Sequence, residues 1–70
     1  MLRFEGSVLC QDKQRREYSV LLYSESQTGK RHAYLEEAFR RRRLAILKDG
    51  ASFRILDEGT VIRPVTNRPP

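Results

Sequence analysis

The sequence predicts a small, mainly β domain of four or five antiparallel strands, curled or closed into a barrel, with one helix starting near Leu35. Polar and apolar residues alternate near the start of the chain, which is typical of a strand with one buried face. Two β-prone segments near the end are joined by a short turn that contains glycine. The chain has 70 residues, 39% hydrophobic and 33% charged, so it should fold around a small core. A ββαββ α+β domain is the alternative.

The chain is expected to form one domain over residues 1–65, followed by a disordered C-terminal tail over residues 66–70, which contains two prolines. The longest apolar runs span four residues, at 20–23 and 44–47, whereas roughly 20 are needed to cross a bilayer. The start shows no apolar segment of signal-peptide length, and there is one cysteine. We therefore expect a cytoplasmic protein that does not associate with a membrane.

The first half of the chain predicts a hairpin. Apolar residues fall on even positions between residues 2 and 10, and Gly6 interrupts this face as a bulge would. Residues 12–16 are polar and form the expected connection. Residues 18–23 carry apolar side chains on both faces, so this strand should be central or lie at an interface.

The middle of the chain is rich in charge. Residues 30–34 predict a short third strand at an exposed edge. Residues 35–43 predict a helix, because Leu35, Ala38 and Phe39 share a face and the acidic residues precede the arginines, as the helix dipole favours. Arg42 falls on the same apolar face, so its stem should be partly buried and its replacement by Ala should mainly lower stability. Residues 44–47 fit either the helix end or a strand.

The last part of the chain predicts a second hairpin, between residues 51–56 and 60–65, with Gly59 in the turn. The expected core takes one residue or more from the apolar side of each segment. Its members are Phe4, Val8, Val20, Leu22, Leu35, Phe39, Phe53, Ile55 and Val61. Cys10 should also face inward as a small buried hydrophobe.

The net charge of +5 is concentrated in one window, because residues 30–48 hold seven basic and two acidic residues. Arginine binds phosphate through a planar fork of donors, so this window predicts a non-catalytic module that binds RNA or single-stranded DNA. The alternative is a small adaptor that docks its basic face on an acidic protein. A solvated face without a partner is the third interpretation.

The candidate nucleic-acid-binding residues come from the first hairpin loop and from the basic window. They are Lys13, Arg15, Arg16, Lys30, Arg31, Tyr34, Arg40, Arg41 and Arg43. Tyr18, Tyr23 and Tyr34 are the side chains that could stack on bases, although aromatic residues at strand spacing more often pack in a core.

Catalysis is not expected. The single histidine, His32, and the single cysteine cannot complete a metal site or an oriented nucleophile, and no nucleotide-binding glycine motif is present. We expect no cofactor and no metal. A chain this short gains little stability from one core, so a homodimer formed through residues 18–23 is possible.

Three segments resemble small OB-fold RNA-binding domains of the bacterial translation initiation factor one family. Residues 5–9 (EGSVL) are similar to its opening strand, residues 18–22 (YSVLL) to its second strand, and residues 41–50 (RRRLAILKDG) to its basic stretch and following turn. An SH3-like barrel fits the same residues. The resemblance implies RNA binding through one face of the barrel. The residues that best match the basic stretch are Arg40, Arg41 and Arg43.

Overall fold

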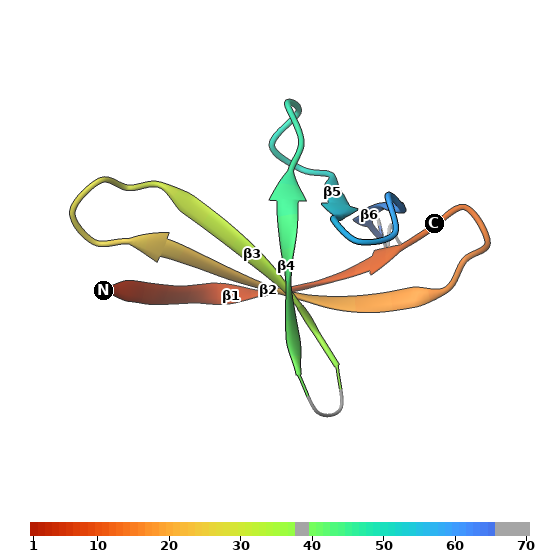
Figure 1. Cartoon of the computed structure of the whole chain (residues 1–70), viewed down its shortest axis with the longest axis horizontal. Coiled ribbons are helices and arrows are strands. Elements are labelled where there is room, and N and C mark those ends of the chain that lie inside the picture. The colour runs from red at the N-terminus through yellow and green to blue at the C-terminus, as the bar shows by residue number, and fades with distance from the viewer. Residues whose placement is uncertain (38–39, 66–70) are drawn as a thin grey trace, which may run out of the picture.

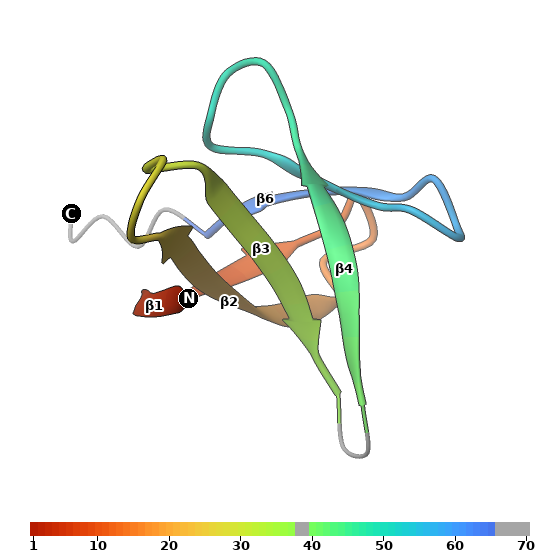
Figure 2. The same cartoon turned by 60° about the vertical axis from the view of Figure 1, so that its left-hand side comes forward.

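The computed structural model describes residues 1–37 and 40–65 and shows a closed antiparallel β-barrel (Figures 1 and 2). Its six strands are β1 (Leu2–Gln11), β2 (Glu17–Glu25), β3 (Arg31–Glu36), β4 (Arg41–Ile46), β5 (Phe53–Ile55) and β6 (Val61–Pro64). The barrel is confirmed, with six strands rather than four or five. None of the described residues forms a helix long and apolar enough to cross a membrane.

Each strand pairs with its neighbours in the sequence, and β6 closes the barrel on β1. The closing contact is short: Cys10 pairs with Pro64 and Gln11 with Arg63, and the Val65 amide donates to the Leu9 carbonyl at 2.9 Å. The N-terminal part of β1 lies instead beside the end of β2, where Leu2 pairs with Glu25 (Figure 1). The pairing of β1 with β6 is therefore confined to the C-terminal end of β1.

The core is built by alternate residues of every strand, because successive side chains of a strand point to opposite faces. Val20 and Ile62 are fully buried, and so is Cys10, as expected. The buried cluster consists of Cys10, Val20, Ala33, Leu35, Leu44, Phe53, Ile55 and Ile62. Leu21 is also buried but lies outside this cluster, on the outer face, which confirms that β2 is apolar on both faces.

The first hairpin matches the sequence prediction, including its bulge. The β1–β2 register shifts between Phe4, which pairs with Tyr23, and Gly6, which pairs with Leu22. Gly6 has a φ of 143°, a conformation that favours glycine. In the connecting turn the Asp12 carboxylate accepts the Gln14 amide at 2.8 Å, which fixes the chain reversal.

The helix predicted over residues 35–43 is wrong, and so is the ββαββ alternative. Leu35 lies in β3, and Leu35 pairs with Arg42 of β4 across an antiparallel hairpin closed by the Glu37 amide and the Arg40 carbonyl at 3.0 Å. A nine-residue helix is marginal in water, whereas two strands in this place satisfy backbone groups of both β2 and β5. The predicted helical face also used residues 38 and 39, which lie outside the described residues.

Two further expectations about the middle of the chain are resolved by the sheet. The segment predicted as an exposed edge forms β3, which is flanked by β2 and β4 and is therefore not an edge. Residues 44–46 continue β4, and Leu44 is buried against Ile55, its partner in β5. The second hairpin is confirmed, with β5 paired to β6 and a φ of 75° at Gly59.

Four of the predicted core residues are buried in the cluster: Val20, Leu35, Phe53 and Ile55. Val8 and Leu22 pack against it in a partly buried state. Phe4 is wrong, since it is 56% exposed, and Val61 is partly exposed outside the cluster. Phe39 lies outside the described residues.

Candidate functional site

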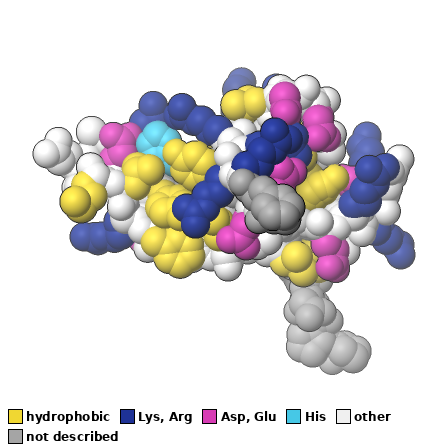
Figure 3. Space-filling view, turned by 60° about the horizontal axis from the view of Figure 1, so that its bottom comes forward, with side chains coloured by type: hydrophobic (Ala, Val, Ile, Leu, Met, Phe, Trp, Pro, Cys, Tyr) yellow, Lys and Arg dark blue, Asp and Glu magenta, His cyan; other side chains and the backbone are white. Residues whose placement is uncertain are grey.

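A row of three aromatic side chains crosses the outer face of β1, β2 and β3. The rings of Phe4 and Tyr23 are 5.5 Å apart at 63°, and the rings of Tyr23 and Tyr34 are 5.6 Å apart at 83°. Both contacts are edge-to-face, the geometry that aromatic quadrupoles favour. Figure 3 shows hydrophobic side chains gathered beside the histidine, with Lys and Arg side chains reaching across them. We call Phe4, Tyr23 and Tyr34 the aromatic row.

Two arginines of β4 flank the aromatic row. Arg41 donates from Nη1 to the Tyr23 hydroxyl at 3.2 Å, and Arg43 is the register partner of Tyr34. Both side chains are exposed, because in an extended strand they point away from Arg42 and Leu44. The strand thus brings three predicted site residues together: Tyr34, Arg41 and Arg43.

His32 joins this face to the start of β3. Its Nε2 lies 2.9 Å from Glu25 Oε2, and its Nδ1 lies 3.4 Å from Arg43 Nη2. The side chain is 12% exposed. The hydrogen bond with His32 holds the pKa of the Glu25 carboxyl below its ordinary value. This carboxyl group is therefore ionised at neutral pH.

A groove of about 380 Å³ lies next to this face, and its charged lining is entirely basic. Lys30, Arg31, His32 and Arg43 line it together with apolar residues of β4 and Leu56. No carboxylate is among the lining residues. We call it the basic groove, and it places two more of the predicted cations, Lys30 and Arg31, around one space with Arg43.

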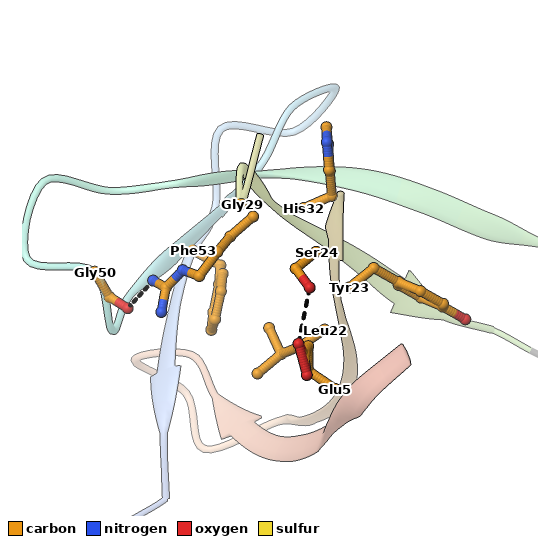
Figure 4. A pocket seen from close by; sticks show the side chains of 9 residues that line it. Glu5, Leu22, Tyr23, Ser24, Gly29, His32, Gly50 and Phe53 are labelled. Carbon is orange, nitrogen blue, oxygen red and sulfur yellow. Dashed lines mark hydrogen bonds between the residues drawn. The ribbon is translucent and has the colours of Figure 1, made fainter. Parts of the chain in front are cut away.

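A second cavity, of about 450 Å³, opens at the end of the barrel beside the basic groove. Figure 4 shows Leu22 and Phe53 in this cavity with Glu5 and Ser24 near them. Arg31 donates from Nη2 to the Gly50 carbonyl at 2.9 Å and so holds the β4–β5 loop against the rim. Arg31 and His32 line both this cavity and the basic groove. We call it the mouth cavity.

Arg42 has a different environment from its neighbours. Its guanidinium contacts Glu37 at 2.6 Å, Asp57 at 3.0 Å and Glu58 at 2.9 Å. The side chain is 17% exposed, which agrees with the partial burial predicted for it, although a strand and not a helix causes that burial. The hydrogen bond to Glu58 is the largest cause that raises the pKa of Arg42, so this arginine is a structural cation.

Arg40 lies in the β3–β4 hairpin and belongs to the same acidic neighbourhood. Its Nε is 3.0 Å from Glu37 Oε2. The hydrogen bonds from Arg40 and Arg42 lower the pKa of the Glu37 carboxyl, with Arg40 the larger cause. Arg40 therefore reaches a phosphate only if it exchanges this ion pair.

The predicted cations of the first hairpin loop lie elsewhere. Arg16 hydrogen-bonds Gln14, and its amide donates to Asp12 at 2.9 Å, which is the largest cause that lowers the pKa of Asp12. Arg15 is exposed with a φ of 65°. Lys13 lines a different cavity, together with Arg16 and Glu58. These three cations are thus separate from the basic groove.

The sequence analysis missed Phe4, His32 and Glu5 as members of this face or of its cavities. A signal for Phe4 was present, because a bulge at Gly6 reverses which face the preceding residues occupy. His32 was considered only as a metal ligand or as part of an oriented nucleophile, and no partner for either role was visible along the chain. Glu5 is the extra residue of the bulge, between the paired Phe4 and Gly6.

Within residues 1–37 and 40–65, no group of three His, Cys, Asp or Glu side chains is placed to hold a metal ion. The strand order is also consecutive, whereas an OB-fold is a five-stranded Greek key. Of the resemblance to the initiation factor family, the small antiparallel barrel is what the structure supports. Comparison with known proteins finds no matching family model, no similar curated protein and no similar solved structure.

Proposed function

We propose that this protein binds single-stranded nucleic acid, RNA or DNA, through the aromatic row and the basic groove, and that it catalyses no reaction on the strand. The observation that carries the proposal is the adjacency of the two features. Arg43 pairs with Tyr34 of the row and also lines the groove. A strand that stacks its bases on the row would therefore have its phosphates beside the groove.

The energies of base stacking and of phosphate binding both favour a site in which the aromatic row contacts the bases and the basic groove contacts the phosphates. Stacking of a base on an aromatic side chain contributes about 1–3 kcal/mol and tolerates any base. Phosphates gain from Lys30, Arg31 and Arg43, whose shared groove has no carboxylate in its lining. A duplex hides its bases from such a platform, so a single strand is the better ligand.

Titration of a labelled oligouridine or oligothymidine of about twelve nucleotides tests the proposal by fluorescence anisotropy at several salt concentrations. The affinity should fall log-linearly with salt, with a slope near 0.7 for each phosphate neutralised. Tyr34→Leu should weaken binding about tenfold because it removes one ring while keeping an apolar side chain. Arg43→Ala should lower the slope by about one phosphate contact.

Arg15→Ala is the matched control, because Arg15 is also an exposed arginine and does not line the groove. It should leave affinity within about twofold of the parent, given that surface substitutions away from a site have small effects. The absence of binding at low salt would refute the proposal. Equal losses for the Arg15 and Arg43 variants would mean that the charge acts without a defined site.

A protein partner is the second candidate, favoured by one observation. Leu2, Phe4 and Leu9 of β1 are 42%, 56% and 47% exposed. Exposed apolar side chains of this kind are typical of a protein interface. A protein partner would cover this strand, either an acidic protein that also docks on the basic groove or a second copy of the chain. Such binding would show a weaker salt dependence than binding of a polyanion, and self-association would appear in sedimentation.

A further inference from the structure

We propose that the mouth cavity receives one base of the bound strand and selects guanine. The inference rests on the proposed binding of a single strand and adds sequence preference to it. Two residues connect the parts: Arg31 lines both the basic groove and the mouth cavity, and Tyr23 belongs both to the aromatic row and to the cavity wall. A nucleotide with its phosphate beside Lys30 or Arg43 in the basic groove thus has the cavity within reach of its base.

The cavity has the size and the wall of a ligand pocket. Its volume of about 450 Å³ lies within the range of roughly 300–1,000 Å³ typical of small-molecule sites. Leu22 and Phe53 provide apolar surface, and Phe53 is itself part of the buried core, so this surface is rigid. Figure 4 shows Leu22 and Phe53 lying between Glu5 and Gly50.

The cavity is lined by one acidic residue, Glu5, and one basic residue, Arg31, and each forms a hydrogen bond with an uncharged group. Glu5 Oε2 accepts a hydrogen bond from Ser24 Oγ at 2.8 Å. Arg31 Nη2 donates to the Gly50 carbonyl at 2.9 Å. A carboxylate has about four lone-pair sites and a guanidinium five N–H donors, so each retains capacity for a ligand.

The bulge explains why a carboxylate occupies this position. Phe4 and Gly6 have partners on β2, while Glu5 between them is the unpaired extra residue. Bulges re-aim a side chain in this way and occur often beside functional sites. Here the bulge allows Phe4 to lie on the outer face while its neighbour Glu5 reaches the mouth cavity.

Guanine is the base whose edges fit this pair. Its N1–H and N2–H₂ groups are two parallel donors for a carboxylate, and its O6 and N7 are acceptors for a guanidinium. Uracil and thymine would turn carbonyl oxygens toward the carboxylate. Adenine and cytosine each offer it one amino group beside a ring nitrogen that is an acceptor, so neither can satisfy both carboxylate oxygens.

The test compares an oligouridine with versions that carry one central guanosine, adenosine or cytidine, titrated against the full chain. The parent should bind the guanosine version about tenfold more tightly than the others, since one bidentate pair discriminates by that order. Glu5→Gln should reduce this preference to about twofold or less while the oligouridine affinity is retained. Glu17→Gln, which changes the charge equally at an exposed site of β2, should leave the preference intact.

Ser24→Ala is the second variant, because it removes the hydroxyl that holds Glu5 but keeps the carboxylate. It should weaken the preference for guanosine less than Glu5→Gln does, and circular dichroism verifies that both variants are folded. Equal binding of all four oligonucleotides by the parent refutes guanine selection and leaves single-strand binding standing. If guanosine monophosphate binds as tightly as the oligonucleotide, the cavity selects guanine but the strand-binding function is refuted. If neither ligand binds, both proposals fail.

Discussion

The two ends of the barrel differ in whether their basic side chains lie next to acidic ones. At the end formed by residues 12–16, 37 and 57–60, basic side chains pair with acidic ones: Arg42 contacts Glu37, Asp57 and Glu58. At the opposite end, formed by residues 26–30 and 47–52, Lys30 and the nearby Arg31 and Arg43 surround a groove without a carboxylate in its lining. We call these the compensated end and the basic end. Net charge counted along the chain therefore does not locate the surface available to a polyanion.

The three arginines of β4 show the same difference within one strand. Extended backbone turns Arg42 toward the side of Leu44, and it turns Arg41 and Arg43 outward beside the aromatic row. Arg42 thus stabilises the barrel, while Arg41 and Arg43 remain available to bind a ligand. The comparison predicts that substitutions at the compensated end mainly change stability, whereas substitutions at the basic end mainly change binding.

The largest effect on stability is expected at Arg42. Arg42→Met keeps an apolar stem but leaves three carboxylates near one another without their cation, so the melting temperature should fall by about 5–10 °C. Arg43→Met is the control and should change it by only a few degrees. Calorimetry measures both. Equal melting temperatures would show that the contacts of Arg42 are as dispensable as those of an exposed arginine.

Paired substitutions at the two ends should give the largest contrast in binding. Lys30→Ala with Arg43→Ala should lower single-strand affinity by more than about tenfold and reduce the salt slope by about two phosphate contacts. Lys13→Ala with Arg15→Ala removes the same charge from the compensated end and should have a small effect. If the second pair weakens binding as much as the first, the first hairpin loop belongs to the interface.

Acid should destabilise the compensated end. The Asp12 and Glu37 carboxyls have pKa values below their ordinary 3.8 and 4.5, mainly through the Arg16 amide and the Arg40 guanidinium. A lowered folded-state pKa adds stability that is complete above the ordinary value and is lost as the pH falls through the folded-state value. Melting temperatures should therefore decline as the pH drops below about 4.5, and Asp12→Asn should make this decline shallower.

The smallest effect is expected at Cys10, which belongs to neither end. Burial raises the pKa of its thiol to about 11, so little reactive thiolate is present at neutral pH. A thiol reagent should label the native protein slowly and the denatured protein at once. Rapid labelling of the native chain would mean that the short β1–β6 closure opens readily.

The strands of the first hairpin, the bulge at Gly6 and the C-terminal hairpin were all predictable, because local patterns encode them. Alternation of apolar residues marks the strands, and glycine marks the positions with positive φ. The small basic β domain and most of its core follow from the same patterns. The inward position of Cys10 follows from its place in that alternation.

The segment around Arg40 to Arg43 could not be assigned in this way. Helical and strand periodicities both fit a short run there, and the choice depends on backbone partners from β2 and β5, which are distant in the sequence. The same pairing decides which arginine is compensated, because Asp57 and Glu58 come close to Arg42 only when the barrel closes. Composition thus determines how much positive charge the chain carries. Strand pairing determines where it lies, since the register sets which side chains face an acid and which face the solvent.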